Sequence, residues 1–129
     1  MYRGEIIVSG VSKTETEAVI REAVEVLDSQ DDPRPGLVRE AVRAAIAELA
    51  AAAPGKSVEV RVPPYAAVQC IAGPKHTRGT PPNVVECAPE TFLQLVSGRV
   101  SFRECVADGR VSASGPRADI SGHLPLVWA

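Results

Sequence analysis

Three residues that can carry positive charge, Lys75, His76 and Arg78, lie close together in the segment GPKHTRGTPPNVVE, residues 73–86. Glycines on both sides let backbone amides turn toward an anion, so this segment is a candidate site for a phosphate or a carboxylate. It matches neither of the glycine-rich nucleotide-binding motifs, G-x-G-x-x-G and G-x-x-x-x-G-K-[ST]. The alternative is a stiff connection between two strands, and the prolines favour it because each fixes φ at about −65°. We expect an ordered loop in which Arg78 binds loop carbonyls or Glu86.

The sequence offers little for catalysis or metal binding. His76 and His123 are the two histidines, and a nucleophile needs a base beside it. His123 lies near Asp119 in the sequence, but these residues do not define a triad. Cys105 stands among apolar residues, which is typical of a small core residue. The cysteines and histidines do not have the close spacing of a metal site. We therefore predict a protein that is not an enzyme and needs no cofactor and no metal.

The composition favours a globular domain with an aliphatic core. The chain has 129 residues, of which 45% are hydrophobic but only 4% aromatic. The formal net charge of −2 argues against a nucleic-acid partner and against binding to a membrane surface. No run of about 18 apolar residues and no basic-then-apolar leader is present, so we expect neither membrane insertion nor a signal peptide. The odd number of cysteines, three, favours reduced thiols and a cytoplasmic protein.

Periodicity predicts one strand and two helices in the first half of the chain. Residues 5–9 form a β-branched run between two glycines, which is typical of a strand. Ser12 and Glu15 have the spacing of a capping box, so we expect a helix to begin there. Its predicted apolar face consists of Val19, Ala23, Val26 and Leu27. A second helix is expected over about 35–53, after a segment rich in proline and aspartate. Its predicted buried stripe consists of Leu37, Ala41, Val42, Ala45, Ile46 and Leu49.

The second half begins with an alternating pattern, in which valines separated by one polar residue indicate half-buried strands. The expected strands lie at 57–63, 65–72, 83–88 and 109–114. We predict that they form one sheet with helices on one face. Pro89 suits the first turn of a helix. Ser101 and Glu104 form a second capping box that begins a short helix. Residues 116–129 are expected to form a short helix or an irregular end.

The pattern ETFLQLVSG followed by FRECVADGRVSASG, in residues 90–115, joins a helix turn, a short amphipathic helix and a glycine-bounded strand. Its positions are Phe92, Leu95 and Gly98, then Gly109, Val111 and Gly115. Together with residues 57–86, these motifs resemble the sterol carrier protein family, in particular a bacterial single-domain branch. The resemblance covers about residues 37–127. It implies an α+β sandwich with a mostly antiparallel sheet of about four or five strands, helices packed on one face and an apolar cavity between the layers.

This resemblance also implies a function, that of a non-enzymatic binder or carrier of a hydrophobic small molecule such as a sterol, a fatty acid or an acyl chain. The expected walls of its site are apolar positions that could converge between the sheet and the helices. They are Phe92, Leu95, Val96, Phe102, Val106, Leu124 and Leu126.

The alternative is a protein-interaction or regulatory module of the same fold, in which the core is filled and the loop of Lys75 to Arg78 contacts a partner. A continuous apolar void would favour the carrier. The sequence also leaves a homo-oligomer open. For the domain organisation we expect an N-terminal strand–helix extension at 1–30, a linker at 31–36 and the family's domain at 37–129.

Overall fold

The computed structural model describes residues 12–29, 34–73 and 83–129. Three parts of the sequence prediction lie outside the described residues. They are the strand expected at 5–9, residues 31–33 of the expected linker, and the cluster of Lys75, His76 and Arg78. The described part contains two helices, three strands, two further helices, a fourth strand and a short 3-10 helix, in that order.

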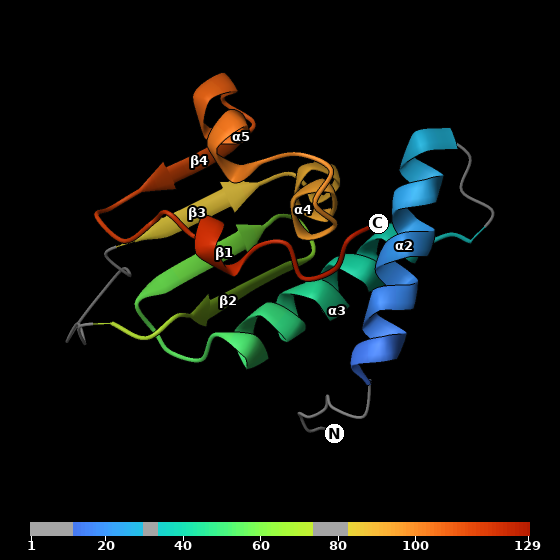
Figure 1. The fold of residues 1–129 in the computed structure, drawn as a ribbon, viewed down its shortest axis with the longest axis horizontal. Coiled ribbons are helices and arrows are strands. Elements are labelled where there is room, and N and C mark those ends of the chain that lie inside the picture. The colour runs from blue at the N-terminus through green and yellow to red at the C-terminus, as the bar shows by residue number, and fades with distance from the viewer. Residues whose placement is uncertain (1–11, 30–33, 74–82) are drawn as a thin grey trace.

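The four strands form one sheet, as the sequence predicts (Figure 1). They are β1 (Val58–Val62), β2 (Ala66–Cys70), β3 (Val84–Cys87) and β4 (Val111–Ser114). Their spatial order is β2-β1-β3-β4. The β1–β2 and β3–β4 pairs are antiparallel, while β1 and β3 run parallel in the centre. The chain must therefore cross over between β1 and β3, and the sheet is mixed although most of its pairs are antiparallel. The α+β class predicted from the resemblance is confirmed.

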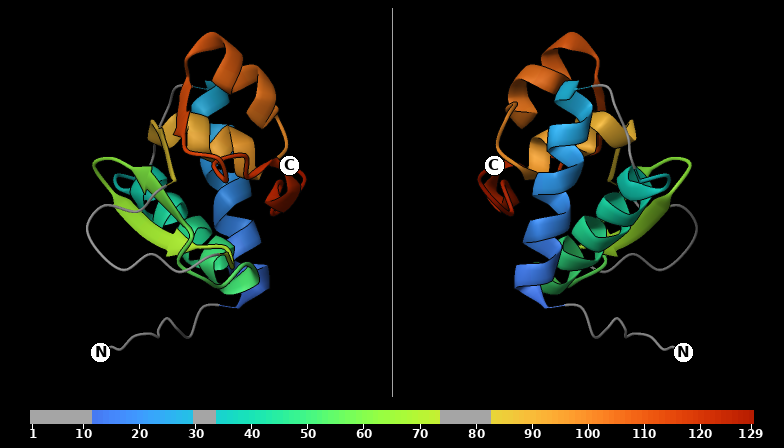
Figure 2. Two further views of the ribbon diagram at one scale, coloured as in Figure 1. Left: turned by 90° about the vertical axis from the view of Figure 1, so that its left-hand side faces the viewer. Right: turned by 90° about the vertical axis from the view of Figure 1, so that its right-hand side faces the viewer.

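One face of the sheet is buried and the other is partly exposed, as the alternating valines of β1 predict. Val58, Val60 and Val62 are fully buried on one face, because side chains along a strand point alternately to opposite faces. On the other face Arg61 Nε donates to Glu59 Oε2 at 2.7 Å. Figure 2 shows the helices and the C-terminal segment on one side of the sheet. The buried valines therefore form the boundary between the sheet and the helices.

The helix α2 (Lys13–Ser29) begins at the predicted capping box. Ser12 Oγ accepts from Glu15 N at 3.1 Å, and Glu15 Oε1 accepts from Ser12 N at 3.1 Å. The buried face differs from the predicted one: Val19, Val26 and Leu27 are only half-buried. Its buried residues are Thr16, Ile20, Ala23 and Val24. The reason is that α2 packs against both α3 and α4, which moves the centre of the contact to one side of the predicted stripe.

The helix α3 (Leu37–Ala52) carries the predicted buried stripe, and all six of its residues are buried. It begins two residues later than expected because Gly36 has φ 87°, a left-handed conformation that cannot continue a helix. Ala53 N donates to Leu49 O at 2.9 Å and closes the last turn. No helix in the three described stretches is long and apolar enough to cross a membrane.

Two short helices follow the third strand. The helix α4 (Pro89–Val96) has Pro89 in its first turn, as predicted. After it, Arg99 N donates to Gln94 O and Gly98 N to Leu95 O, the pair of bonds that defines a Schellman motif with Gly98 in the left-handed position. The helix α5 (Phe102–Asp108) then begins at the predicted capping box of Ser101.

The C-terminal segment contains the 3-10 helix η1 (Ser121–His123) and then an extended stretch that lies on the end of α4. Leu126 N and Val127 N both donate to Val96 O, at 2.9 and 3.0 Å. Ala129 N donates to Ser97 O at 3.0 Å. These bonds use carbonyls that the last turn of a helix leaves unpaired, so the end of the chain is fixed to the helix layer.

Candidate ligand-binding groove

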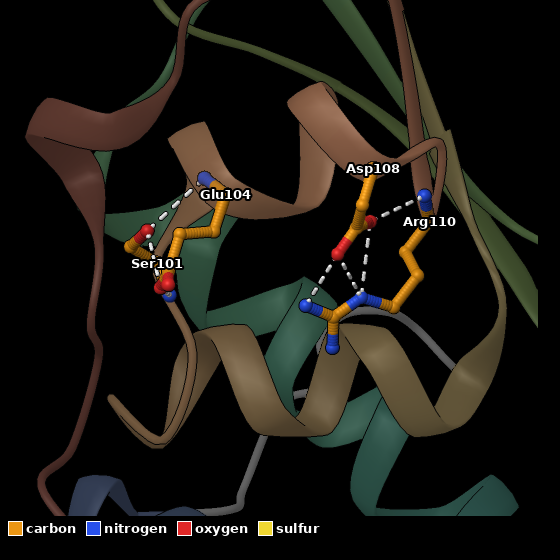
Figure 3. A network of polar contacts seen from close by, with 4 residues as sticks. All are labelled: Ser101, Glu104, Asp108 and Arg110. Carbon is orange, nitrogen blue, oxygen red and sulfur yellow. Dashed lines mark hydrogen bonds and ion pairs between the residues drawn. The ribbon is translucent and has the colours of Figure 1, made fainter.

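The helix α5 is held at both ends by polar contacts, which Figure 3 shows. At its start, Glu104 N donates to Ser101 Oγ at 3.1 Å. Just after its end, the guanidinium of Arg110 lies 2.8 Å from Asp108. Hydrogen bonds from Arg110 hold the pKa of the Asp108 carboxyl below its ordinary value, so the pair is charged at neutral pH. These contacts fix the orientation of a helix that is too short to be stable alone.

A groove of about 570 Å³ lies between the start of α5 and the C-terminal segment. Its apolar wall consists of Leu95, Val100, Phe102, Leu124, Pro125 and Trp128. Phe102 is buried and forms the inner part, whereas Leu124 and Pro125 are half-buried at the edge. Arg99 and Arg103 add positive charge, and Glu104 a negative one. The groove thus combines apolar surface with a small number of charged groups, the usual composition of a small-molecule site.

Trp128 contributes an aromatic surface to this groove. Its side chain is 73% exposed, although a tryptophan normally buries most of its area. A Cβ at position 98 would clash with the six-membered ring of the indole, so the ring lies directly on the backbone of Gly98. The neighbouring backbone bonds of Val127 and Ala129 fix this placement. The indole is therefore held in position while much of its surface faces outward.

A second groove, of about 410 Å³, adjoins the first along α5. The two share Phe102, Arg103 and Ser121. The second groove continues past Val106 and Ala107 toward the strand β4. Its further walls are Ala113, Gly115, Pro116, Ala118 and Asp119. Val106 is 39% exposed, so its side chain is open to whatever the groove holds. The two grooves therefore meet at Phe102, Arg103 and Ser121.

Arg103 is the charged residue between the two grooves. Its side chain makes no hydrogen bond and no ion pair with any residue in the described part of the chain, whereas Arg99 is paired with Asp28 at 2.6 Å. Hydrogen bonds from Ser121 lower the pKa of Asp119, and the charge of Arg103 lowers it further by a smaller amount. The side chain of Arg103 is thus available to bind an anionic group, and the Asp119 carboxylate is a charged group near it.

The seven predicted wall residues fall into two groups. Leu95, Phe102, Val106 and Leu124 line the grooves. Phe92 and Val96 are fully buried in the core, and Leu126 is half-buried against it. The sequence analysis missed Trp128 and Arg103, whose positions depend on contacts between distant segments. Of the predicted anion loop, only the flanking residues are described.

The space between the sheet and the helices is packed with side chains. Val60, Val85, Phe92 and Leu93 are each at most 1% exposed there. The grooves in the described part of the chain lie at the surface, in contrast to the cavity between layers that the resemblance implies. At these positions large buried side chains fill the space between the layers. The two grooves along α5 lie outside this packed boundary.

The buried thiols are poor nucleophiles. Cys105 has no exposed surface, as predicted for a core residue, and Cys87 is 6% exposed. Burial raises the pKa of Cys87 to about 12 and also raises the pKa of Cys105. Because the thiolate is the reactive form, the raised pKa values disfavour the reactive form of both thiols at neutral pH. Among the residues that the structure describes, no cluster of three or more His, Cys, Asp or Glu could hold a metal ion.

The sequence of this chain matches a known protein family over most of its length. The model of the bacterial SCP ortholog family matches residues 34–126, which include every described strand, α3, α4, α5 and all residues that line the two grooves along α5 except Trp128. The helix α2 lies before the matched region. No curated protein matches the chain. Since the match covers more than two thirds of the sequence, the chain belongs to the family of bacterial sterol carrier protein orthologs.

Proposed function

We propose that this protein binds a hydrophobic small molecule, such as a sterol, a fatty acid or an acyl chain, in the two adjoining grooves along α5. The observation that carries the proposal is the sharing of Phe102, Arg103 and Ser121 by the two grooves. Each volume lies within the range of about 300–1,000 Å³ that is usual for small-molecule sites. Membership in a carrier family supports the same function.

An apolar chain would lie against the exposed side chains of Val106 and Trp128, with Phe102 between them. Covering this surface removes apolar area from water, at about 25 cal/mol for each Å². A carboxylate at the end of the ligand would face Arg103, which lines both grooves and forms no ion pair within 4 Å with any described residue, although the carboxylate of Asp119 lies near enough to feel its charge. The protein would then hold its ligand by packing and charge, without chemistry on it, as a carrier requires.

Displacement of a fluorescent fatty acid tests this proposal. Val106→Glu places a carboxylate in the second groove, and we expect it to weaken binding about tenfold because a charge must lose water when the chain enters. Ala67→Glu makes the same charge change on the exposed face of the sheet and is expected to bind as the wild type does. Equal affinities in both variants would exclude this groove, and no displacement with the wild type would exclude the function.

The contribution of Arg103 is tested with two ligands. Arg103→Ala is expected to weaken binding of a fatty acid about tenfold, because charge-assisted hydrogen bonds stabilise the complex. The same variant should bind an uncharged sterol as the wild type does. A loss that is equal for both ligands would show that Arg103 contributes packing rather than charge.

A second candidate is the interaction or regulatory module, and the packed layer boundary favours it. The fully buried Val60, Val85 and Phe92 leave little room for a ligand between sheet and helices. In this case the exposed Trp128 would contact a protein partner, since tryptophan is common at the centre of interfaces. The displacement experiment separates the two functions, because a module of this kind does not bind the fluorescent fatty acid.

A further inference from the structure

A groove of about 590 Å³ lies between α2 and α3, and it shares no residue with the grooves along α5. It runs along the face of α3 that points away from the buried stripe. Its apolar surface consists of Val19 from α2 and Ala44, Ala47 and Ala51 from α3. Ala47 and Ala51 are exposed, and Val19 and Ala44 are half-buried. Small side chains here would allow the axis of another helix to come close.

The charges of this groove are separated by sign along α3. Arg39 and Arg43 line the end near the start of the helix, and Glu48 lies toward its other end, where Glu15 of α2 also lines the groove. Glu40 does not offset the two arginines, because Arg34 binds it at 2.6 Å. The surface is therefore positive at one end and negative at the other.

These charges are not compensated within the described part of the chain. Arg39, Arg43 and Glu48 form no ion pair with any described residue. The two arginines are four residues apart on one helix face, where like charges destabilise a helix. Arg43 and Glu48 are five residues apart, so they do not face each other on their own helix. A partner with a negative charge near Arg39 and Arg43 would reduce the repulsion between them. Because Arg43 and Glu48 do not pair with each other, both are available to pair with groups on that partner.

We infer that this groove binds the same groove of a second copy of the chain, with the two α3 helices antiparallel about a two-fold axis near Ala44 and Ala47. This arrangement places Arg43 opposite the partner's Glu48 and, by symmetry, Glu48 opposite the partner's Arg43. A surface with opposite charges at its two ends is self-complementary only when the second copy runs antiparallel, and a two-fold axis perpendicular to the helices gives an isologous dimer of this kind. The alanines meet at the centre, where the helices are nearest. This inference goes beyond ligand binding and is independent of it.

Sedimentation equilibrium of charge-exchange variants tests this dimer. Arg43→Glu and Glu48→Arg are each expected to raise the dissociation constant of the dimer by about tenfold or more, because each places like charges opposite each other twice. The double variant R43E/E48R exchanges both signs and should return the constant to within about threefold of the wild type. Ala47→Gln adds bulk without charge at the centre and should also weaken the dimer.

The controls concern the fold and the other grooves. All three positions lie outside the buried stripe of α3, so circular dichroism should show wild-type helix content in every variant. Displacement of the fluorescent fatty acid should be unchanged, which separates this inference from the proposed function. A wild-type chain that stays monomeric throughout the concentration series would overturn the inference. A dimer that the single exchanges do not weaken, or that the double exchange does not restore, would overturn it as well.

Discussion

Replacing Gly98 by alanine tests how the end of the chain builds the first groove. Gly98 has φ 76°, and an alanine in the left-handed region costs about 1–2 kcal/mol. The added Cβ would also clash with the indole of Trp128. The ring must then leave its seat, where it buries about a quarter of its surface. Losing roughly 60 Å² of burial costs about 1.5 kcal/mol. We expect a total loss of about 2–4 kcal/mol in the free energy of unfolding.

Gly109→Ala provides a matched control. Gly109 also ends a helix in the left-handed conformation, with φ 87°, but an added Cβ there meets no atom within 4 Å. This variant should lose only the conformational part, about 1–2 kcal/mol. Urea unfolding gives both values, and the fluorescence of Trp128, the single tryptophan, reports the ring directly. We expect changed emission in the Gly98 variant alone. If both variants lose the same unfolding free energy and neither changes the emission of Trp128, the indole does not pack on Gly98.

Three further predictions concern helix α5 and its neighbours. Ser101→Ala removes the capping oxygen and should lower the free energy of unfolding by about 1 kcal/mol in urea titrations; an unchanged value would contradict the capping box. Because burial raises the pKa of Cys87 to about 12, a thiol reagent at neutral pH should modify it only after unfolding, and rapid modification of the native protein would contradict its burial. The pKa of Asp108 is lowered in the folded state, so its contribution to stability is present above the unfolded pKa and is lost as the pH falls through the folded one. Asp108→Asn should therefore make stability less dependent on pH in acid, and an unchanged dependence would argue against the pair with Arg110.

The regular parts of the fold could be predicted because their signals are periodic. The stripe on α3 and the valines of β1 repeat at fixed intervals, and both faces are buried as expected. Both capping boxes were also predicted, since each depends on residues only three apart. The face of α2 was predicted less well. Ile20 has no exposed surface and was not included, because its burial is decided by two neighbouring helices rather than by the sequence of α2.

Polar contacts between residues far apart in the sequence leave no periodic pattern from which they could be predicted. Asn83 is 2% exposed and connects two distant segments. Its Nδ2 donates to Ser57 O at 2.7 Å, and its Oδ1 accepts from Arg117 N at 2.7 Å. Nothing in a single asparagine indicates partners 26 and 34 residues away. The position of the Trp128 indole was equally hard to predict from the sequence. The ring packs on the backbone of Gly98, and it can do so only because Gly98 has no side chain. The walls Leu95 and Phe102 were predicted because apolar helix residues are candidates in any such fold.

The position of the grooves outside the packed layers has a consequence for the proposed function. A cavity between sheet and helices would be lined by core residues, and each change of its lining would also cost stability. Along α5, in contrast, Val106 and Trp128 are exposed, and the helix is held by its polar ends rather than by these side chains. Their substitution should leave the packing of Phe92 and Val60 unchanged. Ligand preference could therefore diverge within such a fold through exposed residues, at little cost to the core that defines it.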